Sequence, residues 1–155
     1  MKKFFILSCF VLLCACSKND DSATQNQKTI SSIDKETVFS FNVANLQSGC
    51  DNSSEMICTI NLAVKCILNP DFSECRSAKD ILPAFVFMQD ESLQRPTFQS
   101  YKISKLTPRS DGSIEVKTQS SCNGNWFGLC NGNITYIMKY AKSKWHISDM
   151  YATEF

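Results

Sequence analysis

The chain has 155 residues, and its sixteen Lys and Arg and fifteen Asp and Glu leave a formal net charge of +1 at pH 7. The length suits one domain with a hydrophobic core and is too short for two ordinary domains. With no basic excess and no long block of like charge, the composition argues against a nucleic-acid-binding protein.

The first sixteen residues have the pattern of a secretory signal. Lys2 and Lys3 precede an apolar run over residues 4–13 that only Ser8 interrupts. A run of about ten apolar residues fits a signal peptide and is too short to span a bilayer. The segment ends in the sequence Leu13-Cys14-Ala15-Cys16.

This ending resembles the lipobox of bacterial lipoproteins, in which a branched apolar residue and two small residues precede a cysteine. The resemblance implies that residues 1–15 are removed as a signal peptide. It also implies that Cys16 carries a diacylglyceryl thioether and an acylated amino group, which would anchor the protein in a membrane of the bacterial cell envelope. A plain secreted protein whose signal contains cysteines is the alternative.

Residues 16–32 are polar and lack hydrophobic periodicity, so we expect a flexible tether before a single domain over residues 33–155. Ser17, rather than Asp, follows Cys16, which by resemblance to enteric lipoproteins favours the outer membrane. The segment from Cys16 to Asp21 also resembles acidic tags that carry some lipoproteins to the cell surface. A merely solvated linker is an equal alternative, and the periplasmic and surface locations both stay open.

Six cysteines follow Cys16, at Cys50, Cys58, Cys66, Cys75, Cys122 and Cys130. An even number in an exported chain favours disulfides, and no Cys-x-x-Cys spacing suggests a metal site. Cys58 and Cys66 lie about 12 Å apart in one predicted helix at ~1.5 Å per residue, which is too far to bond. Among the remaining pairings, which sequence alone does not decide, the pairs that close short loops are Cys50–Cys58, Cys66–Cys75 and Cys122–Cys130. A redox-active pair is the functional alternative.

The first half of the domain has helical patterns. Phe39, Val43 and Leu46 have helical spacing in the first segment, and Asn69-Pro70 stops the second. We expect helices over residues 32–46 and 55–68, a short one from Ser73, and one over residues 78–88 that Pro83 starts or breaks.

The second half alternates apolar and polar residues, with an Asp111-Gly112 turn. Strands are expected over residues 97–106, 114–118, 134–140 and 145–151. The alternation predicts an antiparallel sheet with one buried face. The fold class is therefore α+β, with N-terminal helices packed on a curved antiparallel sheet of about four strands and disulfides bracing it.

The last strand, from Lys144 to Met150, follows three helices and a long hairpin. Over roughly residues 33–153 this arrangement resembles the cystatin-like cone of the nuclear transport factor two-like superfamily. The chain lacks the Gly common before the Lys-Trp step and carries six cysteines that the family does not require. The resemblance implies a fold and no particular activity, because this fold hosts enzymes, binders and scaffolds.

The most unusual local sequence runs from Cys122 to Cys130 and continues to Asn133, so that Cys-Asn-Gly-Asn occurs twice. Asn and Gly tolerate positive φ, so both copies indicate tight turns. Trp126 and Phe127 lie between them, where a disulfide-braced loop would present them for recognition. The alternative is that Trp126 folds back to cap the sheet.

Two polar residues of the last strand are candidates for chemistry. His146, the only histidine, is expected to face away from the core, and Asp149 is expected to share the face of Trp145. There Asp149 would project into a cone lined with Tyr136, Met138 and Trp145, or make a local backbone hydrogen bond. The sequence contains no nucleophile elbow, phosphate loop or zinc motif, so we predict no catalytic residue, no metal and no cofactor.

These patterns together predict a lipid-anchored, non-enzymatic envelope protein that binds a protein partner or acts as a scaffold. It would contact the membrane through the lipid on Cys16 and bind no nucleic acid. The alternatives are a small-ligand binder or enzyme with a cone-shaped pocket near Asp149, and a purely structural lipoprotein.

Overall fold

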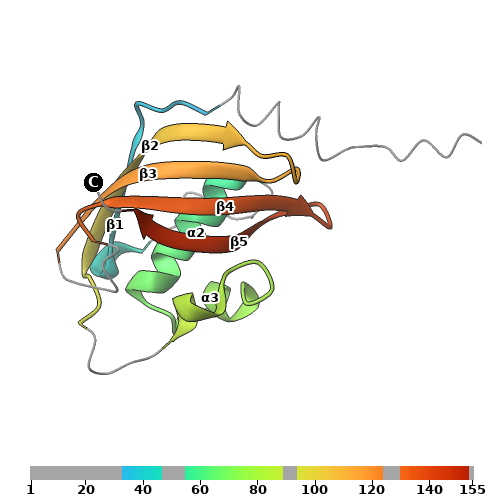
Figure 1. Cartoon of the computed structure of the whole chain (residues 1–155). Helices are drawn as coiled ribbons and strands as arrows, with labels where there is room; N and C mark the ends of the chain where they lie inside the picture. Colours follow the sequence, from blue (N-terminus) through green and yellow to red (C-terminus); the bar gives the residue numbers. More distant parts are fainter. Residues whose placement is uncertain (1–32, 47–54, 89–93, 124–129, 154–155) are drawn as a thin grey trace, which may run out of the picture.

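The computed structural model describes residues 33–46, 55–88, 94–123 and 130–153 (Figure 1). The expected signal peptide, Cys16 and the tether lie outside the described residues. So do Cys50, Trp126 and Phe127.

A five-stranded antiparallel sheet in the order β1-β2-β3-β4-β5 forms the body of the domain. The strands are β1 (Val38–Asn42), β2 (Phe98–Pro108), β3 (Ile114–Cys122), β4 (Asn133–Ala141) and β5 (Lys144–Thr153). The strands from β2 to β5 form a meander, and β1 pairs with the free edge of β2. The sheet therefore has one strand more than the four expected.

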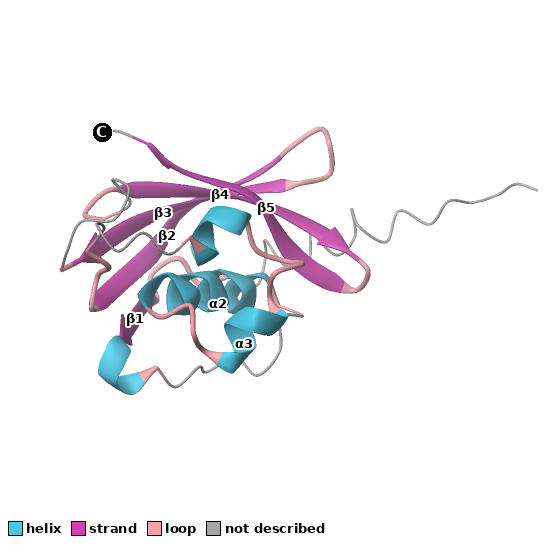
Figure 2. Cartoon of the chain, turned by 90° about the horizontal axis from the view of Figure 1, so that it is seen from below, coloured by secondary structure: helices cyan, strands magenta, loops and turns pink. Residues whose placement is uncertain are grey.

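The described helices all lie on one side of this sheet (Figure 2). They are α2 (Met56–Leu68), α3 (Ser73–Ser77) and the 3-10 helices η1 (Val43–Asn45) and η2 (Ala84–Phe87). None of them is both long and apolar enough to cross a membrane. The arrangement is α+β as predicted, but a strand comes first and the helices are few, so the helices are not clearly N-terminal.

The predicted helix over residues 32–46 is wrong. Residues 38–42 instead form β1, in which Phe39 lies opposite Tyr101 and Phe41 opposite Gln99. Both phenylalanine rings stack on Tyr101, with centroids 4.9 and 6.2 Å away. These residues have a period of two, and aromatic and β-branched side chains favour strands. The cross-strand contacts therefore outweigh the helical spacing that Val43 and Leu46 suggest.

The other predicted helices agree more closely with the structure. Glu55 precedes the first turn of α2, and Asn69 caps its C-terminal end just before Pro70, as expected. Residues from Ser73 form the short helix α3. The segment over residues 78–88 is not a continuous helix: a turn comes first, and Pro83 immediately precedes η2. Proline lacks the N–H that a helix interior needs, which explains the break.

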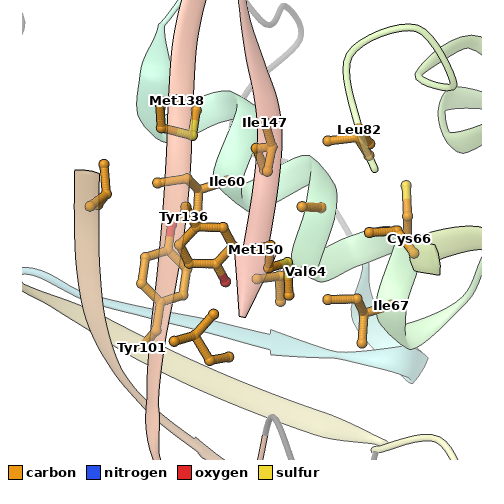
Figure 3. Packing of buried hydrophobic residues seen from close by; sticks show 14 of the residues in the cluster. Ile60, Val64, Cys66, Ile67, Leu82, Tyr101, Tyr136, Met138, Ile147 and Met150 are labelled. Atoms are coloured by element: carbon orange, nitrogen blue, oxygen red, sulfur yellow. The ribbon is translucent and has the colours of Figure 1, made fainter. Parts of the chain in front are cut away.

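The core lies between α2 and the inner face of the sheet, which we define as the face toward α2. Ile60, Val64 and Ile67 of α2 are buried against side chains from four strands (Figure 3). The largest fully buried side chains of that face are Trp145, Tyr101, Tyr136, Ile103, Ile114, Ile134 and Met138. Each fully buried large apolar side chain contributes about 1.5–3 kcal/mol relative to exposure. The inner face is thus lined by buried side chains that pack with α2.

An ion pair between a buried lysine and a half-exposed glutamate joins α2 to α3 beside a disulfide. Cys66 is bonded to Cys75 with their Cα atoms 5.6 Å apart. Next to it, the Lys65 Nζ lies 2.9 Å from Glu74 Oε1 and 4.8 Å from the centroid of the Phe72 ring. The Lys65 side chain is 4% exposed and that of Glu74 is 49% exposed. The hydrogen bond from Lys65 is the main cause that lowers the pKa of Glu74 from 4.5 to about 2.

This pair predicts a stability difference that depends on pH. A carboxyl group with a depressed pKa stabilises the folded state above pH 4.5, and this stabilisation is lost as the pH falls toward about 2. We expect Glu74→Gln to be less stable than the wild type near neutral pH, and the gap to close near pH 2. Chemical unfolding across this range measures it. Glu36→Gln, on an exposed residue, is the control. A gap that stays constant with pH would refute the role of the Glu74 charge.

Candidate functional site

The connection between β3 and β4 is closed at its base by a disulfide. Cys122 is the last residue of β3, and its Cα lies 5.2 Å from that of Cys130, to which it is bonded. Together with Cys66–Cys75, two of the three expected pairs are therefore present. The third, Cys50–Cys58, involves Cys50, which lies outside the described residues.

Asn131 holds one side of this base. Its φ of 56° lies in the left-handed region, which Asn tolerates better than most residues. The Asn131 Oδ1 accepts a hydrogen bond of 3.0 Å from the Cys122 N–H and one of 3.4 Å from the Ser121 hydroxyl. The carbonyl of Gly132 accepts a bond of 2.8 Å from the Ser120 N–H. The positive φ expected of the second Cys-Asn-Gly-Asn copy is thus present at Asn131.

Asn123 holds the other side and ties it to the start of β2. Its Oδ1 accepts a hydrogen bond of 2.7 Å from the Phe98 N–H, and its Nδ2 donates one of 2.7 Å to the Thr97 Oγ1. In both copies of the repeat, the Asn after the Cys therefore uses its side chain to bind backbone. The sequence indicated only turns at these residues, because their partners are set by where the strand ends lie in space.

The consequence is a connection whose two ends are fixed. Residues 124–129, which include the candidate recognition residues Trp126 and Phe127, lie outside the described residues. The chain enters and leaves this stretch at Asn123 and Cys130, both held by the bonds above. A segment with fixed ends loses less conformational entropy on binding a partner than one with free ends.

The prediction that Asp149 shares the face of Trp145 is wrong. The register shifts between Ile137 and Met138, which lie opposite Asp149 and Ile147 respectively. Ser148 is thus an extra residue, and Asp149 lies on the face away from α2, exposed to solvent. Its Oδ1 accepts a hydrogen bond of 2.8 Å from the Met150 N–H. This is the local backbone contact that was the alternative interpretation.

The residues proposed to line a pocket do not come together. Tyr136, Met138 and Trp145 are fully buried in the core, whereas Asp149 is on the opposite face. Burial is the main cause that raises the pKa of Tyr136, because it disfavours the phenolate. The Tyr136 hydroxyl and the Trp145 indole N–H are buried without a hydrogen-bond partner. The arrangement leaves no carboxylate pointing into the interior at this position.

His146 faces away from the core, as predicted, and is half buried. Its Nδ1 lies 3.2 Å from the Asp80 carbonyl oxygen and its Nε2 3.0 Å from the Ala141 carbonyl oxygen. The ring therefore links the turn after α3 to the β4–β5 hairpin. Within the described ranges, no group of three His, Cys, Asp or Glu residues is placed to hold a metal ion.

The chain matches no family model, and no curated protein or solved structure is significantly similar to it.

The Asn131 contacts give a test of the braced base. Asn131→Ala removes the acceptor for the Cys122 N–H and places a Cβ-bearing aliphatic residue at positive φ. We expect this to cost about 1–3 kcal/mol of stability and to speed amide exchange at Cys122. Asn131→Gly adopts this positive φ without strain but still lacks the acceptor for the Cys122 N–H. It should therefore recover only the part of the lost stability that comes from backbone strain. If the Cys122 amide exchanges equally fast in the Asn131→Ala variant and in the wild type, the bracing role of Asn131 is refuted.

Proposed function

We propose that this protein is a lipid-anchored, non-enzymatic module of the bacterial cell envelope that binds a protein partner through the β3–β4 connection. The single observation that carries the recognition part is the braced base of that connection, where a disulfide and two Asn side chains fix both ends. The anchor rests on the lipobox resemblance of Leu13 to Cys16.

Trp126 and Phe127 are the residues proposed to contact the partner. Aromatic side chains bury large areas and dominate the energetics of protein interfaces. A connection with fixed ends can present them at a low entropic cost. The burial of Tyr136, Met138 and Trp145 against α2 supports the same proposal, because these side chains are not exposed to a ligand from solvent.

Two finer points belong to this proposal. The curled sheet around α2 supports a cystatin-like cone of the nuclear transport factor two-like kind, although β1 stands where that resemblance implied a helix. We propose the outer membrane as the location, because Ser17 rather than Asp follows Cys16. If the β3–β4 connection binds no partner, we propose that the protein acts as a scaffold.

Crosslinking in cells tests this function. The full chain, with its own signal, is expressed in a Gram-negative host with and without Trp126→Ala/Phe127→Ala, and crosslinked proteins are identified by mass spectrometry. We expect the double variant to lose at least one crosslinked envelope protein, because its aromatic anchors are gone. Met88→Ala is the matched control, since Met88 is an exposed apolar residue, 57% accessible.

The anchor is tested in the same cells. Cys16→Ser should abolish incorporation of a labelled fatty acid and release the protein from the membrane fraction. Unchanged crosslinks in the double variant, at equal abundance, would contradict recognition through Trp126 and Phe127. Fatty-acid labelling of the Cys16→Ser variant would contradict the lipid anchor.

A further inference from the structure

The face of the sheet away from α2, here called the outer face, is rich in lysine. Cross-strand partners share a face of a sheet, and the register places Lys105 opposite Lys117, Lys117 opposite Thr135, and Thr135 opposite Tyr151. The lysines of the outer face are Lys102, Lys105, Lys117, Lys139 and Lys144. No described helix covers this face (Figure 2).

Two of these lysines are placed directly against each other. Lys105 and Lys117 are cross-strand partners, and like charges in such positions destabilise a sheet. Glu115 lies 3.6 Å from the Lys117 Nζ, and Asp111 lies 3.5 Å from the Lys139 Nζ. These carboxylates offset only part of the positive charge, so an external anion would relieve the remaining repulsion.

The positive charge of the outer face is part of a wider asymmetry. Residues 98–153 carry seven Lys and Arg and three Asp and Glu, a net +4. Residues 33–88 carry four Lys and Arg and seven Asp and Glu, a net −3. The positive charge of a near-neutral chain is thus concentrated in the segment that forms β2 to β5, and the segment before it is negative. Such a charge separation orients a domain at a charged surface.

The cross-strand row of the outer face that runs through Lys105, Lys117 and Thr135 ends at Tyr151, a side chain suited to a membrane interface. Tyr151 is 40% exposed there, and tyrosine concentrates at membrane–water interfaces because its ring is apolar and its hydroxyl polar. The row therefore combines positive charge with an amphipathic ring.

The membrane lies within reach of this face if Cys16 is lipidated, and this step rests on the proposed function. Residues 17–32 number sixteen. A tether of that length spans about 55 Å when extended, at roughly 3.4 Å per residue, and about 22 Å as a flexible coil. The domain would thus stay within tens of ångströms of lipid headgroups, which raises their effective concentration.

We propose that the outer face docks on the phosphate-bearing headgroups of an anionic phospholipid bilayer. The headgroup phosphates would neutralise Lys102, Lys105 and Lys117, and Tyr151 would lie at the interface. Each lysine near an anionic surface strengthens binding roughly fivefold. Docking would also fix the orientation of the anchored domain, and with it the position of the braced β3–β4 connection.

Lysine footprinting on vesicles tests the docking. The full chain, expressed with its own signal and purified, is added to vesicles of phosphatidylcholine alone or with roughly one-third phosphatidylglycerol. Acetylation of each lysine is then measured by mass spectrometry. We expect acetylation of Lys105 and Lys117 to slow several-fold on the anionic vesicles, relative to Lys79 after α3. Salt at about 0.5 M should restore the rate, because it screens the attraction.

Charge reversal provides the matched variants. Lys102→Glu/Lys105→Glu should abolish the protection of Lys117, and two reversals should weaken docking at least roughly 25-fold. Arg76→Glu/Lys79→Glu, at exposed positions of α3 and the turn after it, makes the same change in net charge. In that variant the protection of Lys105 and Lys117 should remain.

Two outcomes would overturn the docking, and a third concerns the anchor alone. Equal acetylation on both kinds of vesicle would refute it. Protection that requires added envelope protein, whatever the lipid charge, would assign the outer face to an acidic protein instead. Flotation with the neutral vesicles reports the lipid anchor separately. A chain that fails to float there, yet shows protected lysines on anionic vesicles, would refute the anchor and leave the docking intact.

Discussion

The packing of α2 against the inner face of the sheet is the contact on which the rest of the structure depends. Ile60 and Val64 of the helix are fully buried, as is Trp145 on the facing strand β5. The sheet curls around this helix, and the charged residues of β2 to β5 lie on the other face. The Cys66–Cys75 bridge and the Lys65–Glu74 pair hold the segment after α2 in place.

The extra residue at Ser148 divides β5 into two parts with different roles. Before it, Trp145 and Ile147 enter the core. After it, Met150 enters the core, and Asp149 and Tyr151 are exposed. The Ser148 hydroxyl donates a hydrogen bond of 3.1 Å to the Ile137 carbonyl, which stabilises the shift. The bulge keeps a carboxylate out of the interior and places Tyr151 in line with Lys105 and Lys117. The single extra residue Ser148 thus determines which later side chains of β5 are buried in the core and which are exposed on the outer face.

Local patterns sufficed for much of this fold. α2, the Asp111-Gly112 hairpin and the two described disulfides follow from apolar spacing, turn residues and short loops, which act over a few neighbours in the chain. β1 did not follow, because Phe39 and Phe41 are fixed by Tyr101, some sixty residues away. The bulge was missed as well, although the two consecutive polar residues Ser148 and Asp149 interrupt the alternation between Ile147 and Met150. The side-chain contacts of Asn123 and Asn131 likewise required the three-dimensional positions of the strand ends.

Carboxyl footprinting measures most directly whether the bulge in β5 turns Asp149 outward. In the native protein, carbodiimide coupling followed by mass spectrometry should modify Asp149 about as fast as Asp34. Asp34 is a fair reference, because it is exposed and its carboxylate also accepts a backbone N–H bond, of 2.9 Å. If Asp149 is protected in the native state and reacts only after unfolding, the carboxylate points into the interior and the account is contradicted.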